Sequence, residues 1–296
     1  MSDRCRVRIL EAAPPFSIAL GLVGDLGSDP KNIALFTDDD FSPANATILP
    51  RSGISAATQF RSLAAAGDDF YYGYTFAPNT AKADATNAII LQDSTAKVRC
   101  ITAGGGRVFA LVDPSNTLVE INTTTLAHTP ISITGLTDPL WIYSSATDLW
   151  IVDDNYANIK LTSWNLSSGL QGATFNIESL AGAALNPSGL AVSDNGKYAA
   201  VPMSTKLWVF DLSAPSLLSG PDDSSHSIES NTANPCVFNG NVFYGATANS
   251  KSIVRRDMAS ESALTAVYTS APGDFGGADT AGTWYNTSIH PLTIIR

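Results

Sequence analysis

The chain has 296 residues, with 17 lysines and arginines against 27 aspartates and glutamates, so its formal net charge is −10. It contains no run of cations that could bind a phosphate backbone, which argues against a nucleic-acid partner. Because 44% of the residues are hydrophobic and only 15% are charged, the composition argues against intrinsic disorder and predicts a globular protein with a large core.

The N-terminal segment begins at Met1 and carries basic residues but no apolar run of signal-peptide length, and it is followed by the helix-breaking pair Pro14 and Pro15. The longest apolar stretch, residues 16–23, is much shorter than the roughly 20 residues that a membrane helix needs. We therefore expect a soluble, acidic protein that is made in the cytoplasm without a signal peptide and is not inserted into a membrane.

Helical periodicity is almost absent. Residues 52–66 are one candidate helix, but the segment 60–66 is equally compatible with a strand. Elsewhere, apolar runs of four to eight residues are separated by clusters of Gly, Asn, Asp, Pro and Ser, a pattern that predicts strands and turns. The expected fold class is all-β.

A tight polar turn followed by an aromatic or aliphatic strand start recurs along the whole chain. The successive starts lie 37, 38, 41, 49, 44 and 42 residues apart. A period near 40 in an all-β chain is typical of a β-propeller, in which each blade is a sheet of four antiparallel strands. The seven starts are Ile33, Phe70, Val108, Leu149, Tyr198, Val242 and Trp284.

The order of strands within a unit agrees with this interpretation. One unit divides into expected strands at residues 97–103, 107–113, 117–123 and 129–134, with a Pro-Ser-Asn turn between the second and the third. The next unit has expected strands at 139–145, 149–153 and 159–165 in the same order. Such spacing favours hairpin-connected strands in every blade.

The clearest unit is the block Pro-Ser-Gly-Leu-Ala-Val-Ser-Asp-Asn-Gly-Lys-Tyr at residues 187–198, followed by an aromatic strand ending in Asp211-Leu212. Asn195 and Gly196 are expected to form a type I′ turn with two positive φ angles. This block resembles a blade of the WD40-like and YVTN-like β-propeller superfamily. The resemblance implies a propeller fold and no particular activity, because such propellers host hydrolases, dehydrogenases, receptors and scaffolds.

We expect each of the seven starts to begin the second strand of a blade. Seven starts over 296 residues give about 42 residues per blade, so we expect a single seven-bladed propeller spanning 1–296. The C-terminal residues 293–296 can form the third strand of a blade to which residues 5–11 supply the fourth, so that the two ends of the chain close the ring. Six or eight blades, and two packed β-sandwiches, remain as alternatives.

Motifs that carry chemistry are mostly missing from the sequence. There is no GxGxxG loop before a helix, and no GxSxG elbow occurs. The cysteines at 5, 100 and 236 are too far apart for a zinc knuckle and are expected to be buried free thiols. His128, His226 and His290 lack metal-ligand spacing. We therefore predict no catalytic, cofactor-binding or metal-binding residues, and we leave partner-binding residues open.

Acidic clusters and aromatic residues each allow two interpretations. Pairs or triplets of carboxylates could hold Ca²⁺, but none completes a calcium-binding loop, so turn residues are the favoured interpretation. The aromatic residues are expected to pack between blades, although several exposed on one face would form a sugar-binding platform. The acidic clusters are Asp38–Asp40, Asp68–Asp69, Asp153–Asp154 and Asp222–Asp223, and the aromatic residues are Tyr71, Tyr72, Tyr74, Trp141, Trp150, Trp164, Trp208 and Trp284.

The sequence thus favours a non-catalytic propeller that binds other proteins, within a multi-subunit assembly. Low charge, abundant Ala, Ser, Thr and Asn and the missing catalytic set make a virion component, in particular of a bacteriophage tail, the most specific hypothesis. An intracellular host scaffold explains the same composition. The alternatives in other classes are a lactonase-like or glycan-active propeller enzyme with a divalent ion in its channel, and a carbohydrate-binding propeller.

Overall fold

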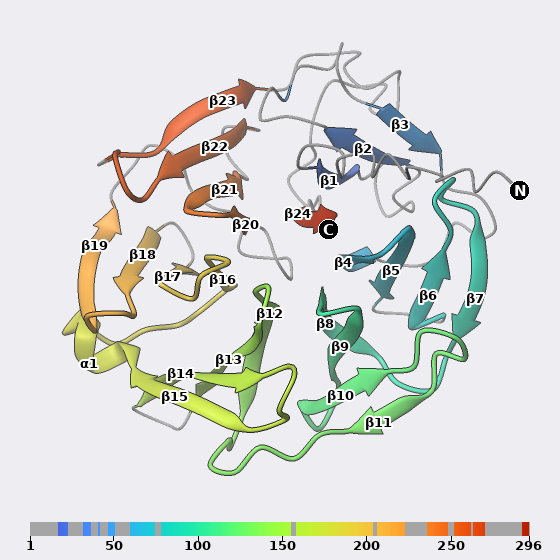
Figure 1. Ribbon diagram of the computed structural model, residues 1–296, viewed down its shortest axis with the longest axis horizontal. Helices are drawn as coiled ribbons and strands as arrows, with labels where there is room; N and C mark the ends of the chain where they lie inside the picture. The colour runs from blue at the N-terminus through green and yellow to red at the C-terminus, as the bar shows by residue number, and fades with distance from the viewer. Residues whose placement is uncertain are drawn as a thin grey trace, which may run out of the picture.

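The computed structural model describes residues 17–22, 32–36, 41, 47–50, 60–74, 78–154, 158–203, 206–222, 236–247, 252–261, 263–269 and 292–295. These residues form six four-stranded antiparallel sheets, which are the blades of a β-propeller arranged around a centre (Figure 1). The blades are numbered by their order around the ring. Among the described residues, no helix is long and apolar enough to cross a membrane.

Blades 1 to 3 contain twelve strands, in order from the centre of the ring outward. Blade 1 consists of β24 (Leu292–Ile295), β1 (Ser17–Leu22), β2 (Asn32–Phe36) and β3 (Thr47–Pro50). Blade 2 consists of β4 (Phe60–Ala66), β5 (Asp69–Tyr74), β6 (Thr80–Ala83) and β7 (Ile89–Asp93). Blade 3 consists of β8 (Val98–Gly104), β9 (Arg107–Val112), β10 (Thr117–Ile121) and β11 (His128–Pro130).

Blades 4 to 6 have the same plan. Blade 4 consists of β12 (Pro139–Ser144), β13 (Asp148–Asp154), β14 (Ile159–Asn165) and β15 (Gln171–Asn176), after which comes the short helix α1 (Ile177–Ala181). Blade 5 consists of β16 (Ala191–Val192), β17 (Tyr198–Met203), β18 (Lys206–Asp211) and β19 (Ser216–Asp222). Blade 6 consists of β20 (Cys236–Asn239), β21 (Val242–Ala246), β22 (Ser252–Asp257) and β23 (Thr265–Thr269).

The innermost strands form a continuous ring. Each of β4, β8, β12, β16 and β20 contacts the innermost strand of the next blade, and β24 contacts both β20 and β4. The blades of the described residues therefore surround the centre without an interruption. The sequence predicted seven blades, and the described part of the chain contains six, which was one of the alternatives.

The difference arises at the two ends of the chain. Six of the seven predicted strand starts lie in six different blades, and the seventh, at Trp284, falls outside the described residues. Ile33 lies in the third strand of its blade rather than the second, because the C-terminal strand β24 supplies the innermost strand. The described strands near the two ends of the sequence thus belong to one blade, whereas the starts at Ile33 and Trp284 predicted two separate blades.

Closure of the ring by the first and last strands is confirmed. β24 pairs antiparallel with β1, and the register places Ser17 opposite Ile295 and Leu20 opposite Leu292. The strand β24, predicted at residues 293–296 as the third strand of its blade, is instead the innermost one. Its partner is Ser17–Leu22, and the predicted partner at residues 5–11 lies outside the described residues. Hydrogen bonds of this pairing satisfy the inner edge of β1.

The structure decides one local alternative in favour of the strand and shows that one turn prediction was wrong. Phe60–Ala66 is the strand β4 and not part of a helix. The hairpin at Asn195-Gly196 is not a type I′ turn, because only Gly196 has a positive φ, of 67°. The Gly196 N–H donates to the Ser193 carbonyl (2.8 Å) and the Lys197 N–H donates to Asn195 Oδ1 (3.0 Å). The Asn195 side chain therefore stabilises a turn that places a single glycine in the left-handed region.

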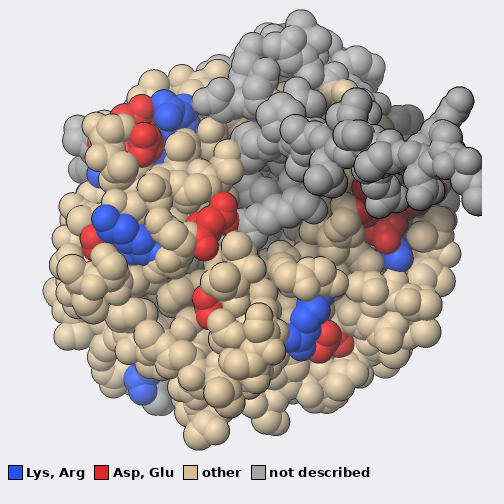
Figure 2. Space-filling view, viewed as in Figure 1, with Lys and Arg blue, Asp and Glu red and all other residues tan. Residues whose placement is uncertain are grey.

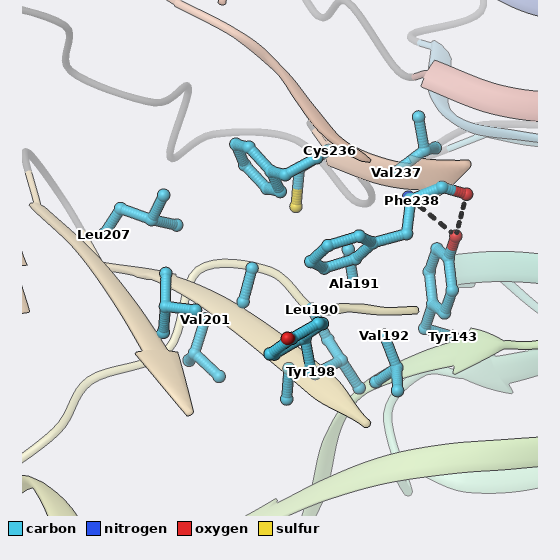
Figure 3. Packing of buried hydrophobic residues seen from close by; sticks show 14 of the residues in the cluster. Tyr143, Leu190, Ala191, Val192, Tyr198, Val201, Leu207, Cys236, Val237 and Phe238 are labelled. Carbon is cyan, nitrogen blue, oxygen red and sulfur yellow. Dashed lines mark hydrogen bonds between the residues drawn. The ribbon is translucent and has the colours of Figure 1, made fainter. Parts of the chain in front are cut away.

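Apolar residues pack between neighbouring blades, as the aromatic pattern predicts. In Figure 3, Tyr143 of β12 points toward β20, where its hydroxyl accepts from the Phe238 N–H (3.1 Å) and donates to the Phe238 carbonyl (3.5 Å). This contact joins blade 4 to blade 6 past the two-residue strand β16. Trp141 is partly buried, Trp284 lies outside the described residues, and the buried aromatic residues of the predicted set are Tyr71, Tyr72, Tyr74, Trp150, Trp164 and Trp208.

Candidate functional site

The alternation of strand direction divides the connections between two faces of the ring. Connections from the second to the third strand of a blade, and from one blade to the next, emerge on the same face. Residues 94–97, between β7 and β8, and residues 113–116, between β9 and β10, therefore lie together on this face. We call it the groove face.

A groove of about 660 Å³ lies between blades 2 and 3 on the groove face. A volume of this size is in the range of small-ligand sites. The lining mixes polar residues with Ala96 and Pro114, contains two cations and one carboxylate, and has no aromatic member among the described residues. The lining residues are Asn79, Thr95, Ala96, Lys97, Arg99, Asp113, Pro114 and Asn116.

Arg99 reaches the groove because of an irregularity in β8. Val98 pairs with Val112 and Cys100 pairs with Leu111, so Arg99 is the extra residue of a β-bulge. A bulge bends a strand and redirects a side chain, which places a charged residue beside otherwise apolar positions. The Arg99 Nη1 group donates to Asn116 Oδ1 at 3.1 Å.

Asn116 connects the groove to blade 4. Its backbone has a φ of 48°, a conformation that asparagine tolerates better than most residues. Its Nδ2 group donates to Asp138 Oδ1, in the connection that leads to β12. With Arg99 on one side and Asp138 on the other, both ends of the Asn116 amide are engaged, which fixes the side chain's orientation.

Lys97 and Asp113 lie opposite each other at the start of β8 and the end of β9. The Asp113 N–H donates to the Lys97 carbonyl at 2.8 Å, so the two backbones are adjacent. Lys97 is exposed and Asp113 is partly buried. Within the described part of the chain, neither side chain forms an ion pair or a hydrogen bond. The groove therefore presents a cation and a carboxylate that are available to a ligand.

Hydrogen bonds hold the walls of the groove and the neighbouring connection. Asn79 Nδ2 donates to the Ser94 carbonyl (2.9 Å), and the Thr95 hydroxyl donates to Asp93 Oδ1 (2.6 Å). Near Asp138, the buried Asp153 carboxylate accepts from the N–H groups of Thr137 (2.8 Å) and Asp138 (2.7 Å). The connections on the groove face are thus tied to blades 2 and 4.

The remaining charges are sparse, and three of the other described cations form ion pairs with carboxylates. Figure 2 shows one face of the ring, on which most of the surface is uncharged and basic groups generally stand next to acidic ones. Lys82 pairs with Asp69 at 2.8 Å, Arg107 pairs with Glu120 at 2.6 Å, and Arg255 pairs with Glu261 at 2.7 Å. Lys97 and Arg99 differ from these cations because neither faces a carboxylate of the described residues within ion-pair distance.

The acidic clusters behave mainly as turn or pairing residues where the structure describes them. Asp68 and Asp69 lie at the turn between β4 and β5, and Asp69 is the partner of Lys82. Asp153 is buried and hydrogen-bonded, and Asp222 ends β19. Asp38–Asp40 and Asp223 lie outside the described residues. Within the described residues, no group of three or more His, Cys, Asp or Glu side chains is placed to hold a metal ion.

The histidines and cysteines are not brought together in the part of the chain that the structure describes. His128 lies in β11, with its Nε2 atom 3.8 Å from Asp93 Oδ2 in blade 2, while His226 and His290 lie outside the described residues. Burial lowers the pKa of His128, and the negative charge of Asp93 opposes that effect. Cys100 and Cys236 are buried free thiols, as predicted, and Cys5 is not among the described residues.

Lys97 and Arg99 were not predicted as site residues from the sequence. The available signal was weak: the two cations alternate with apolar residues at the start of a strand that is otherwise uncharged as far as Gly104. An outward-facing residue on a half-buried strand has the same pattern. The bulge that redirects Arg99 and the approach of residues 113–116 depend on pairing between strands, which the local pattern does not contain.

Comparisons with known proteins identify the fold and no family. No protein-family model matches the sequence, and no curated protein matches it. Many solved structures are similar, among them a chain of the crystal structure of a nidogen/laminin complex. The match has a TM-score of 0.62 and 13% sequence identity, and it covers 95% of this chain and 98% of that one. At this identity, the likeness shows a β-propeller fold alone.

Proposed function

We propose that the chain is a non-catalytic β-propeller that binds another protein through its groove face, as a component of a multi-subunit assembly. The observation that carries the proposal is the groove between blades 2 and 3, in which the side chains of Lys97 and Asp113 have no partner among the described residues and Arg99 is bonded only to a neutral amide. Arg99 and Asn116 are already oriented by hydrogen bonds, so these two side chains can bind a partner with a small loss of side-chain entropy. The described lining holds no aromatic side chain, which favours a protein over a sugar.

The similar solved chain gives limited support. It belongs to the crystal structure of a nidogen/laminin complex, so a propeller of this general shape occurs in a protein–protein complex. Membership of the WD40-like and YVTN-like superfamily is also part of our proposal, on the basis of residues 187–198 and 206–212.

Within this class, we propose a virion component, most specifically of a bacteriophage tail, on the basis of composition. Quantitative mass spectrometry of purified particles from the source tests it. We expect the chain at a fixed integer copy number per particle. If the chain is absent from particles but present in cells, the virion assignment is wrong while the interaction proposal stands.

Site-specific photo-crosslinking in the source tests the interaction proposal itself. A photoreactive amino acid replaces Thr95 at the groove or, as the matched control, Ser168 between β14 and β15 on the opposite face; both positions are exposed. We expect one recurring protein adduct from position 95 and none from position 168. The proposal is contradicted if position 95 gives no protein adduct, or if the purified protein contains one stoichiometric Ca²⁺ ion and hydrolyses lactones or glycans.

A further inference from the structure

The charged side chains of the groove are not neutralised by ion pairs, unlike three other cations of the described residues. Lys82, Arg107 and Arg255 each have a carboxylate within 2.8 Å. Lys97 has no such partner among the described residues, although the backbones of Lys97 and Asp113 are joined by a 2.8 Å hydrogen bond. Because Asp113 does not neutralise Lys97 in this structure, the groove keeps both signs of charge available for a ligand.

Arg99 adds directed hydrogen-bond donors to this pair of charges. A guanidinium has five N–H donors in a planar fork, and the only hydrogen bond of the Arg99 side chain in the described structure is the one from Nη1 to Asn116 Oδ1. The fork therefore retains an unoccupied edge that matches the two oxygens of a carboxylate. Since Asn116 is itself held by Asp138, the orientation of Arg99 is fixed from the blade 4 side.

The nearby acidic groups restrict which anion can bind. Asp113 lines the groove, and the Asp138 carboxylate lies one hydrogen bond beyond Asn116. A doubly charged phosphate would be repelled by both carboxylates. A single carboxylate accompanied by a cation in the same ligand would instead be complementary to Lys97 and Arg99 on one side and to Asp113 on the other.

We propose that the groove binds an extended peptide segment of the partner in which an acidic residue is followed two positions later by a basic residue. The acidic side chain binds Lys97 and Arg99, and the basic side chain binds Asp113. Side chains two residues apart in an extended peptide lie on the same side, about 6.6 Å apart. This spacing matches the roughly 5–8 Å that separates opposite and diagonal side chains of two adjacent strands such as β8 and β9. This inference rests on the proposed function, whose interaction face it uses.

Titration of the full-length, isotope-labelled protein tests the inference by NMR. The probe is acetyl-Gly-Glu-Gly-Lys-Gly-amide, and the matched control replaces its Glu by Gln. We expect shifts at residues 95–99 and 113–116 that saturate with a dissociation constant of about 1 mM, because exposed ion pairs contribute little individually. We expect the Gln peptide to bind at least about tenfold more weakly, since its amide cannot form the charge-assisted bonds.

Variants separate the groove from the overall charge of the protein. Arg99→Gln should reduce affinity for the Glu peptide by about tenfold, whereas Lys197→Gln, on the opposite face, should leave it unchanged. A two-dimensional spectrum that is unaltered outside the substituted region verifies the fold of each variant. If the Arg99→Gln and Lys197→Gln variants lost affinity for the Glu peptide equally, the inference would be overturned.

Other outcomes are equally decisive. The peptide assignment is contradicted if the two peptides bind equally, or if inorganic phosphate or free glutarate binds more tightly than the Glu peptide. It is also contradicted if no shifts occur at 20 mM peptide, roughly twenty times the expected dissociation constant. A protein adduct from position 95 together with any of these results would leave the proposed function standing and remove only this inference.

Discussion

The Asp153 carboxylate is completely buried, and its oxygens accept hydrogen bonds from neighbouring residues. It accepts from the Thr137 N–H (2.8 Å), the Asp138 N–H (2.7 Å) and the Thr137 hydroxyl (3.0 Å). A buried carboxylate is tolerated only when donors replace its lost hydration. Because these donors belong to the connection between β11 and β12, Asp153 fixes the backbone from which Asp138 reaches Asn116.

We expect Asp153→Ala to lower the free energy of unfolding by about 3 kcal/mol, because it removes the buried acceptor of the Thr137 and Asp138 N–H groups and of the Thr137 hydroxyl. Urea-induced unfolding measures the change. The matched control is Asp113→Ala, whose side chain has no hydrogen-bond partner in the described structure and which should change stability by less than about 0.5 kcal/mol. Equal losses in the two variants would show that the hydrogen bonds of Asp153 are not the cause.

The buried thiols lead to a second prediction for single residues. Burial raises the pKa of Cys100 to about 12 and also raises that of Cys236. The thiolate is the reactive form, so at pH 8 both thiols should be inert in the folded protein. In a Cys5→Ser variant, we expect no reaction with a thiol reagent before denaturant is added and two reactive thiols afterwards. Rapid reaction of one native thiol would contradict the described packing.

At the scale of strands and blades, close approach of neighbouring backbones determines how the blades pack. A Cβ at Gly73 of β5 would lie 2.7 Å from Val98 of β8, and one at Gly104 of β8 would lie 2.7 Å from Ser144 of β12. Glycine is required at these positions for space, since neither has a positive φ. Blades 2 and 3, and blades 3 and 4, therefore each approach closely at a glycine.

The outer parts of blades 2 and 3 meet at His128 and Asp93, which yields a pH-dependent prediction. Burial lowers the pKa of His128 below its ordinary value of 6.5, despite Asp93. The unfolded chain therefore binds the proton more readily. The stability linked to His128 is fully present above pH 6.5 and is lost as pH falls through that value toward the lower pKa of the folded state.

We expect the free energy of unfolding of the wild-type protein to fall more steeply between pH 7 and pH 5 than that of His128→Gln. Urea unfolding at half-unit pH intervals measures both. Because His226 and His290 are present in both proteins, their contribution cancels in the comparison. Parallel pH profiles would show that the environment of His128 does not favour its neutral form.

Local sequence signals located most strands but not their partners. Phe70, Val108, Leu149, Tyr198 and Val242 each lie in the second strand of a blade, as the recurring turn pattern predicted. Ile33 has the same local pattern yet lies in a third strand, because its position in the blade depends on β24, more than 250 residues away.

The groove was outside the reach of these signals for a related reason. Period and turn residues predict where β8 and β9 lie, but not that their register shifts at Arg99 or that Asn116 bridges Arg99 and Asp138. Such features come from pairing and side-chain contacts between segments. The buried cysteines and aromatic residues were predictable, since burial depends mainly on apolar character.

For the whole molecule, the pairing of β24 with β1 holds the ring closed. Deleting residues 292–296 removes β24, which exposes the inner edge of β1 and takes away the contacts of β24 with β4 and β20. We expect a fall in melting temperature of about 10 °C or more, because the deletion should lower the free energy of unfolding by several kcal/mol. Differential scanning calorimetry measures it.

The matched control is deletion of residues 1–11, which retains β1 and its pairing with β24. The sequence pattern predicted that this segment forms a closing strand, whereas the described pairing uses Ser17–Leu22. We now expect a much smaller fall in melting temperature for the N-terminal deletion. If the two truncations were equally destabilising, or if removing 292–296 had no effect, the importance of the β24–β1 contact would be disproved.

The same pairing determines the order in which the blades can be completed during protein synthesis. β1, β2 and β3 leave the ribosome first, but their blade lacks its innermost strand until residues 292–295 have been made. At about 5–20 residues per second, the interval between β3 and β24 is on the order of 10–50 s. Blades 2 to 6 can fold in that interval, so the earliest strands of the propeller to be synthesised belong to the last blade to be finished.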